Sequence, residues 1–253
     1  MSEEINHKQL LTILSDFDEV CGKNEISYSL HGGTLLGAVR EKGFIPWDDD
    51  ADVSMTRWEF KRLEAVLDNS HSNYAIRGNI KKQFYRVGED SFWVDIFLCD
   101  PISEKKVPQK LKLLLLTVLD IMNRDRESVK LSNLAEYSKI KQMVFKAVFA
   151  LGHIIPKSWT VKWYLHISER CFAGKREMLF RSNDQYQGRA RIFPTKWMES
   201  YEKISFEDQQ LSILKDWHGM LSQCYGPDYM VPICQERNAV VHDLVRLADT
   251  FAL

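Results

Sequence analysis

Residues 31–53, which read HGGTLLGAVREKGFIPWDDDADV, restrict the fold and the chemistry of this chain more than any other stretch. A glycine pair follows an apolar, strand-like run, and four carboxylates then stand within five residues. Glycines allow backbone amides to approach a phosphate, because no side chain intervenes. Asp50 and Asp52 are two residues apart, so on an extended strand they face the same side, roughly 6–7 Å apart. Because clustered carboxylates repel one another unless a cation lies among them, the stretch predicts a phosphate-bearing substrate and a divalent metal.

The bulk composition is that of a globular enzyme that does not bind nucleic acid. The chain has 253 residues, a hydrophobic content of 45% and a formal net charge of -1. This length supports one large domain with an ample core, and the balanced charge gives no general attraction to nucleic acid. The five cysteines lack any CxxC spacing, which favours a reducing compartment. The polar N-terminus indicates no signal peptide, and we therefore expect a cytoplasmic protein.

The pattern of apolar residues predicts an α+β fold. Helical spacing indicates a first helix that stops near Gly22, and Thr56 with Glu59 forms a capping box that opens a second helix. Strands are expected at 26–30, 51–55, 74–77, 84–87 and 92–98, and the pattern is helical from 108 to 180. Short helices and loops are expected from 181 onward. We expect one catalytic domain over 1–253, with a mixed-sheet core in 1–100, a helical insertion in 101–180 and a helical C-terminal cover in 181–253.

Asp95 is the third carboxylate of the predicted site. It lies within the apolar run FWVDIFL, where a carboxylate is costly unless it is paired or bound to metal. Beside Asp50 and Asp52 it would complete an oxygen site suited to Mg²⁺ or Mn²⁺, which would offset charge during phosphoryl transfer. The turn formed by Gly32, Gly33 and Thr34 would hold the phosphates through its backbone amides. Asp50, Asp52 and Asp95 are therefore the predicted metal ligands and catalytic residues.

Six further residues are candidate substrate contacts, and each also has a purely structural interpretation. They are His31, Arg40, Lys42, Trp47, Arg86 and His242. The histidines and cations either contact phosphate, nucleotide or acceptor, or serve as structural hydrogen-bond donors and surface charges. The tryptophan either stacks on a base or anchors its loop.

The motifs resemble those of a known family. The string GGTLLGAVREKGFIPWDDDADV resembles the signature of the LicD/fukutin-related phosphotransferases, and WVDIF at 93–97 resembles the strand that carries the third carboxylate of that family. Segments between 190 and 243, including YGPDYM, follow its C-terminal pattern. Pro227 departs from the Tyr-Gly-Asp-Tyr common in the family, and the chain has no counterpart of the cysteine cluster in the zinc-binding insertion of fukutin-related members.

The resemblance implies a nucleotidyltransferase-like fold and the transfer of a substituted phosphate from a CDP-linked donor, with release of CMP. The transferred group would be phosphocholine or an alditol phosphate such as ribitol phosphate. The acceptor would be a hydroxyl of a cell-surface glycan or of its lipid-linked precursor. The family's metal carboxylates correspond to Asp50, Asp52 and Asp95, and its glycine turn corresponds to Gly32 and Gly33.

Other functions fit the same residues. A DxD-type glycosyltransferase would use the metal to hold a nucleotide-sugar, and a nucleotidyltransferase would leave the nucleotide on the acceptor. A non-catalytic protein that binds a glycan or nucleotide would keep the site without turnover. The bond that breaks distinguishes these alternatives, because only phosphotransfer leaves the donor's distal phosphorus in the product.

The helical section also invites a membrane interpretation. Apolar residues alternate there with lysines, namely Lys110, Lys112, Lys139, Lys141, Lys146, Lys157 and Lys162. A basic amphipathic surface binds anionic lipid, and a core helix with lysines at its margin has the same pattern. Peripheral contact of 108–172 with the inner face of the cytoplasmic membrane is therefore one expectation, and packing into a core is the other.

Overall fold

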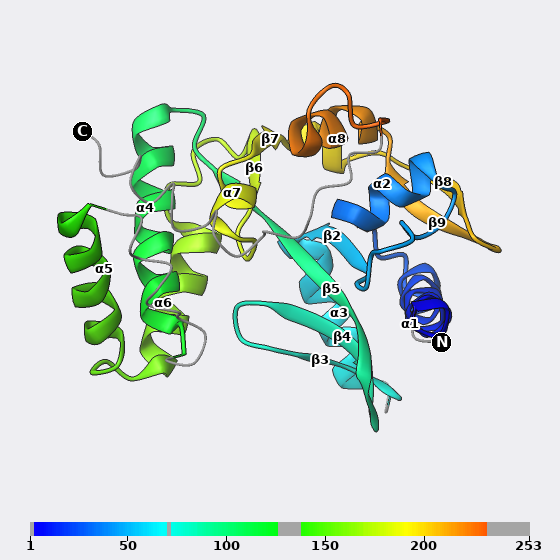
Figure 1. The fold of residues 1–253 in the computed structure, drawn as a ribbon, viewed down its shortest axis with the longest axis horizontal. Helices are drawn as coiled ribbons and strands as arrows, with labels where there is room; N and C mark the ends of the chain where they lie inside the picture. The colour runs from blue at the N-terminus through cyan, green and yellow to red at the C-terminus, as the bar shows by residue number, and fades with distance from the viewer. Residues whose placement is uncertain (1–2, 70–71, 126–137, 232–253) are drawn as a thin grey trace. The chain divides into compact units, whose positions relative to one another are not determined.

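The structure is a computed structural model that describes residues 3–69, 72–125 and 138–231 (Figure 1). The chain forms two compact units. The first unit comprises residues 1–100, 181–184 and 193–232, and the second comprises 101–180, 185–192 and 233–253. The mixture of helices with a mixed sheet confirms the predicted α+β class. The expectation of one catalytic domain stays a prediction.

The first unit is built on a mixed sheet with the strand order β1-β2-β5-β4-β3. The strands are β1 (Ser29–Leu30), β2 (Asp52–Thr56), β3 (Tyr74–Arg77), β4 (Lys82–Arg86) and β5 (Glu89–Ile102). β2 and β5 are parallel, whereas the other neighbours on this path are antiparallel. β6 (Met178–Arg181) pairs with β5 and with β7 (Ile192–Pro194). The predicted strands therefore exist, although β5 is longer than the sequence indicated.

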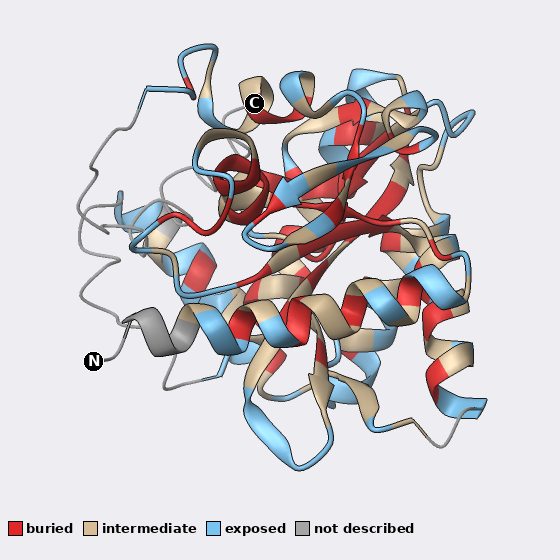
Figure 2. Cartoon of the chain, turned by 90° about the vertical axis from the view of Figure 1, so that its right-hand side faces the viewer, coloured by how far each residue is buried: buried red, intermediate tan, exposed pale blue. Residues whose placement is uncertain are grey.

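The two faces of the central strand β5 differ, because side chains alternate along a strand. Val94, Ile96 and Leu98 are buried on one face. On this side of the sheet, α1 (Glu3–Lys23) contacts β4, and α3 (Arg57–Asn69) contacts β2 and β3. Phe17 of α1 meets Phe84 of β4 with ring centroids 5.2 Å apart. Figure 2 shows buried residues concentrated along the strands and on the inward sides of helices. Asp95 projects from the opposite face and is only half-buried.

The start of α3 confirms the predicted capping residue. Glu59 N donates to Thr56 Oγ1 at 3.3 Å, which satisfies one of the amides that a helix leaves unpaired at its N-terminus. Arg57, the first residue of α3, pairs with the buried Asp100 near the end of β5, with Arg57 Nε donating to Asp100 Oδ1 at 2.9 Å. The helix is thus fixed to the sheet at its first turn.

The C-terminal part of the first unit differs from the expected helices and loops. It contains η3 (Thr195–Met198), a hairpin of β8 (Tyr201–Phe206) and β9 (Gln209–Leu214), and α8 (Trp217–Tyr225). Leu214 N donates to Ser29 Oγ at 3.0 Å, which joins the hairpin to β1. The turn at Glu207 has φ 51° without glycine or asparagine, so it lacks the usual sequence signal of a tight hairpin.

The second unit contains α4 (Lys106–Asn123), α5 (Lys139–Gly152), α6 (Lys157–Arg170) and α7 (Tyr186–Arg189). Both α5 and α6 pack against α4. Lys112 of α4 is fully buried, and its Nζ donates to the carbonyls of Pro101 at 2.7 Å and Ser168 at 2.8 Å. Lys112 therefore packs into a core, which is one of the two interpretations that the sequence offered for these lysines, and it does not face a membrane. Among the described residues, no helix combines the length and the apolar character needed to cross a bilayer.

Candidate functional site

Asp52 and Asp95 are direct partners across two parallel strands. Asp52 is the first residue of β2, and its Cα partner on β5 is Asp95. Register partners project from the same face of a sheet, so the two carboxylates lie side by side although 43 residues (95 − 52) separate them in the chain. This is the juxtaposition that the sequence analysis required. Their catalytic role is not tested by it and stays a prediction.

The glycine turn packs directly against the carboxylates. α2 (Gly32–Arg40) starts immediately after β1 and His31, and Gly32 has a φ of +55°, which favours glycine. A Cβ at Gly32 would lie 2.7 Å from Asp52 Oδ2, and a Cβ at Gly33 would overlap Asp48 Oδ2. The lack of a side chain at both positions is what allows the start of the helix to approach the acidic residues.

Two backbone hydrogen bonds fix Asp52 to the residues that flank the glycines. His31 N donates to Asp52 O at 2.9 Å, and Asp52 N donates to Thr34 Oγ1 at 2.9 Å. Thr34 is fully buried. The helix begins at Gly32, so Thr34 is inside it rather than at its cap, and its hydroxyl serves the strand instead. The turn and the start of β2 therefore form one hydrogen-bonded assembly.

Several neighbouring carboxylates affect the pKa of Asp52. Burial raises the pKa of Asp52 well above its usual range, and the carboxylates of Asp50, Asp95, Asp48 and Asp184 raise it further, in that order. A divalent cation among these groups would stabilise the ionised form. The cluster of charge therefore fits a site that is completed by a bound cation.

The acidic loop supplies the closest group of oxygen donors. Among the residues that the structure describes, the one group of three with ligand atoms within 4.8 Å of one another is Asp48, Asp49 and Asp50. The predicted ligands Asp52 and Asp95 lie outside this group. All of these donors are carboxylate oxygens, which suit Mg²⁺ or Mn²⁺ rather than a softer metal.

Both oxygens of Asp95 already accept hydrogen bonds from neutral donors. Gln83 Nε2 donates to Oδ1 at 2.9 Å, and Trp93 Nε1 donates to Oδ2 at 3.3 Å. Gln83 is also the Cα partner of Asp95 on β4. The contact with Gln83 was not predictable from the sequence, because a glutamine in a strand gives no indication of its partner across the sheet.

Asp184 is a second residue that the sequence analysis missed. It follows β6, and its Oδ2 accepts a hydrogen bond from Arg181 Nε at 2.9 Å. The side chain of the neighbouring Asn183 fixes this segment to β5: its Oδ1 accepts from Leu98 N at 2.7 Å and its Nδ2 donates to Ile96 O at 2.8 Å. Only the folded chain brings Asp184 close enough to affect Asp52.

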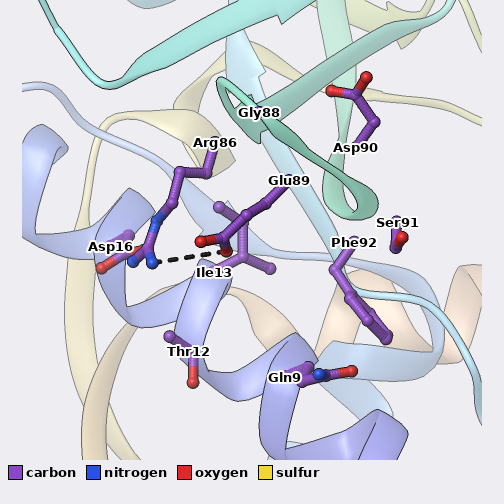
Figure 3. A pocket seen from close by; sticks show the side chains of 10 residues that line it. All are labelled: Gln9, Thr12, Ile13, Asp16, Arg86, Gly88, Glu89, Asp90, Ser91 and Phe92. Atoms are coloured by element: carbon purple, nitrogen blue, oxygen red, sulfur yellow. Dashed lines mark hydrogen bonds and ion pairs between the residues drawn. The ribbon is translucent and has the colours of Figure 1, made fainter.

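Arg86 lies on the face of the sheet opposite to Asp95. Its guanidinium pairs with Asp16 of α1 at 2.6 Å, on the side where Phe84 also meets α1. These ion-paired groups line a cavity of about 410 Å³ between α1 and the β4–β5 turn (Figure 3). In the structure Arg86 therefore forms a salt bridge with Asp16, which is the structural interpretation that the sequence offered for it.

The remaining candidates occupy different surroundings. His31 is buried, with its ring 4.8 Å from that of Phe97, and Trp47 is 51% exposed immediately before the acidic loop. Arg40 ends α2, where its Nε donates to Glu41 at 2.7 Å. Lys42 is exposed, with its carbonyl accepting from Glu207 N at 2.6 Å. His242 lies outside the described residues.

Comparison with known proteins gives matches in the part of the chain that contains this site. The family model described as LicD/FKTN/FKRP, nucleotidyltransferase domain, matches residues 25–110. The lipopolysaccharide cholinephosphotransferase LicD of Haemophilus influenzae is 54% identical over 65 residues, which are 25% of this chain and 24% of that protein.

Two uncharacterized rickettsial proteins are also similar. The one from Rickettsia prowazekii is 41% identical over 58 residues, covering 23% of this chain and 22% of the relative. The one from Rickettsia typhi is 34% identical over 99 residues, covering 39% of this chain and 31% of the relative. The matched segments thus span less than a third of each relative. The family match over residues 25–110 confirms the resemblance to LicD that the glycine and aspartate motifs predicted.

Proposed function

We propose that this chain is a metal-dependent transferase that moves a substituted phosphate from a CDP-linked donor to a hydroxyl of a glycan. The single observation that carries the proposal is the register of Asp52 with Asp95 on adjacent parallel strands, directly beside the glycine turn. Carboxylates in this position can hold a cation, and the backbone amides at a helix start can bind a diphosphate. The proposed acceptor is a cell-surface glycan or its lipid-linked precursor.

In the proposed reaction, an acceptor hydroxyl oxygen bonds to the phosphorus of the transferred group, and the bond from that phosphorus to CMP breaks. Asp95 accepts the hydroxyl proton, and CMP leaves with the electron pair of the broken bond. The amides of Gly32 and Gly33 orient the diphosphate, so most of the rate enhancement comes from alignment and charge neutralisation. Asp48, Asp50, Asp52 and Asp95 would hold a Mg²⁺ or Mn²⁺ ion, which supplies positive charge for the phosphate oxygens.

The first donor to test is CDP-choline, because the named relative from Haemophilus influenzae is a cholinephosphotransferase. CDP-ribitol and CDP-glycerol provide the alternative head groups. CMP release with Mg²⁺ should depend on Asp52, so Asp52→Asn should reduce it about a hundred- to a thousandfold, the scale of losing a main electrostatic contact in the transition state. The matched control is Asp68→Asn, an exposed position in the last turn of α3.

Three outcomes would contradict the proposal. If Asp52→Asn turned over at the rate of the unmodified protein, Asp52 would not be a ligand of a catalytic metal. A glycan product that lacks the donor's phosphorus would instead indicate a glycosyltransferase. Metal-dependent binding of the donor without turnover, across many acceptors, would favour a non-catalytic binding protein.

We also propose that the second unit contacts anionic lipid at the membrane surface, which would bring the enzyme to a lipid-linked acceptor. Exposed apolar residues follow one another on α5 at helical spacing, with Ile140 71%, Met143 65% and Leu151 47% exposed. Trp159 and Trp163 of α6 are 57% and 46% exposed, and Lys146 and Lys162 are exposed on the same helices. Exposed tryptophans and lysines next to apolar residues are typical of helices that lie in a membrane interface.

A further inference from the structure

A row of polar side chains crosses the sheet from the acidic site to its far edge. Asp52 on β2 is the register partner of Asp95 on β5, which partners Gln83 on β4, which in turn partners Arg77 on β3. Register partners project from one face, so these four side chains form a line across four strands. The proposed transfer reaction uses only the first two of them.

Hydrogen bonds connect the outer members of this row to Asp95. Arg77 Nε donates to Gln83 Oε1 at 2.9 Å, and Gln83 Nε2 donates to Asp95 Oδ1 at 2.9 Å. The arginine needs an acceptor and the carboxylate needs a donor, so only one orientation of the Gln83 amide satisfies both. Arg77 therefore determines which end of the Gln83 amide faces Asp95.

Arg77 is also stacked beside the second donor to Asp95. Its guanidinium carbon lies 4.8 Å from the ring centroid of Trp93 and 5.0 Å from that of Tyr85. The indole Nε1 of the same Trp93 donates to Asp95 Oδ2 at 3.3 Å. The other guanidinium nitrogens donate to the carbonyl of Asp90 at 3.4 and 3.5 Å, which holds Arg77 at the edge of the sheet.

We propose that Gln83 and Arg77 are positioning residues that orient the carboxylate of Asp95 for the transfer reaction. The proposal rests on the proposed role of Asp95 as a metal ligand and proton acceptor. Neutral donors fix both oxygens without forming an ion pair, so the negative charge of Asp95 remains available. Gln83 keeps the guanidinium one hydrogen bond away, where it orients the carboxylate without neutralising it. Such outer contacts to metal-binding carboxylates affect metal affinity although they touch no metal.

The test measures Mn²⁺ affinity by calorimetry on the full chain without donor, together with kcat and KM for CDP-choline. Gln83→Met removes both hydrogen bonds at similar side-chain length, and we expect Mn²⁺ affinity and kcat to fall about tenfold or more while the donor KM changes little. Arg77→Met should cause a smaller loss of the same kind. Arg77→Lys should not restore affinity, because lysine lacks the planar geometry for this contact. The loss in the double variant should be less than the sum of the two.

Gln210→Met is the matched control, because it makes the same change in β9 where Gln210 Nε2 donates to Ser205 Oγ, away from Asp95. It should keep the Mn²⁺ affinity of the unmodified protein. The indole N–H resonance of Trp93, assigned with Trp93→Phe, should move on addition of Mg²⁺ in the unmodified protein and move less in Gln83→Met.

Unchanged Mn²⁺ affinity and kcat in Gln83→Met would overturn the positioning role, and so would equal losses in Gln210→Met. Asp95→Asn separates this proposal from the one on which it rests. If Asp95→Asn loses metal affinity and turnover while Gln83→Met loses neither, only the positioning role fails. If Asp95→Asn itself keeps both, the proposed role of Asp95 fails and the positioning role fails with it.

Discussion

At the scale of single residues, the glycine pair beside the carboxylates leaves no room for a side chain. Gly32 has a positive φ, and any Cβ there would lie 2.7 Å from Asp52 Oδ2. A non-glycine residue in this left-handed region costs roughly 1–2 kcal/mol before any clash is counted. The position therefore combines a backbone requirement with a steric one, and both concern the carboxylate of the proposed site.

We expect Gly32→Ala to lower the free energy of unfolding by about 1–3 kcal/mol and to weaken donor binding, because the new methyl group displaces the Asp52 carboxylate. Urea unfolding and calorimetry with CDP-choline would measure the two effects. Gly22→Ala is the control, since a Cβ at Gly22 meets nothing within 4 Å and alanine favours the helix. If both variants bound the donor equally well, Gly32 would have no part in the site.

Residue identities predicted the acidic site only in part. The apolar surroundings of Asp95 in the chain indicated that this aspartate needs a partner. Gln83 and Trp93 provide its hydrogen bonds, and the strand register places it beside Asp52 as the site requires. Gln83 and Asp184 gave no such signal, because their relation to the site depends on strand order and on a segment that returns late in the chain. Local sequence patterns do not contain that information.

At the scale of elements, helices and strands with a clear periodic pattern of apolar residues were predictable from the sequence, and tight irregular turns were not. The Thr56 cap of α3 and the strand at 74–77 agree with the structure, although the Glu59 carboxylate accepts from Ser27 N and Arg62. The β8–β9 hairpin was missed because its turn at Glu207–Asp208 lacks glycine. The helical prediction over 108–180 was wrong at its end, because α6 ends at Arg170 and residues 178–180 belong to the strand β6. Short strands are defined by their partners more than by their own residues.

The exposed apolar residues of α5 lead to a prediction for that helix. Replacing Ile140 and Met143 together by Glu should weaken binding to vesicles that contain phosphatidylserine at least about tenfold, because each residue would insert apolar surface into the interface. Co-sedimentation with such vesicles and with neutral vesicles would measure this. The control is Val87→Glu, which is 58% exposed in the first unit. Equal sedimentation of all three proteins would refute contact of α5 with lipid.

At the scale of the whole molecule, the raised pKa of Asp52 would couple the proposed metal binding to stability. The folded state binds the Asp52 proton more tightly than the unfolded chain, in which an aspartate has a pKa of about 3.9. The resulting stabilisation is complete below that value and is lost as the pH rises through the raised pKa of the folded state. A bound cation would offset this loss, because it stabilises the ionised carboxylate.

We therefore expect the metal-free protein to lose stability as the pH rises above about 4 toward the raised pKa, and Mg²⁺ to restore it near neutral pH. Thermal unfolding with EDTA or Mg²⁺ over this range would measure both effects. Asp52→Asn should lack this part of the pH dependence and should be less stabilised by Mg²⁺. If Mg²⁺ stabilised Asp52→Asn and Asp68→Asn equally, the cation would not bind at the carboxylates around Asp52.

The hydrogen bonds that Asp52 makes through its own backbone have a consequence for any attempt to change donor preference. Its amide is held by Thr34 and its carbonyl by His31, one on each side of the glycines. A substitution that shifts the turn at Gly32 and Gly33 therefore also shifts Asp52. In the proposed enzyme, donor choice and cation affinity would then change together at these positions, so variants with a new head-group preference should be sought among other residues near the ligand.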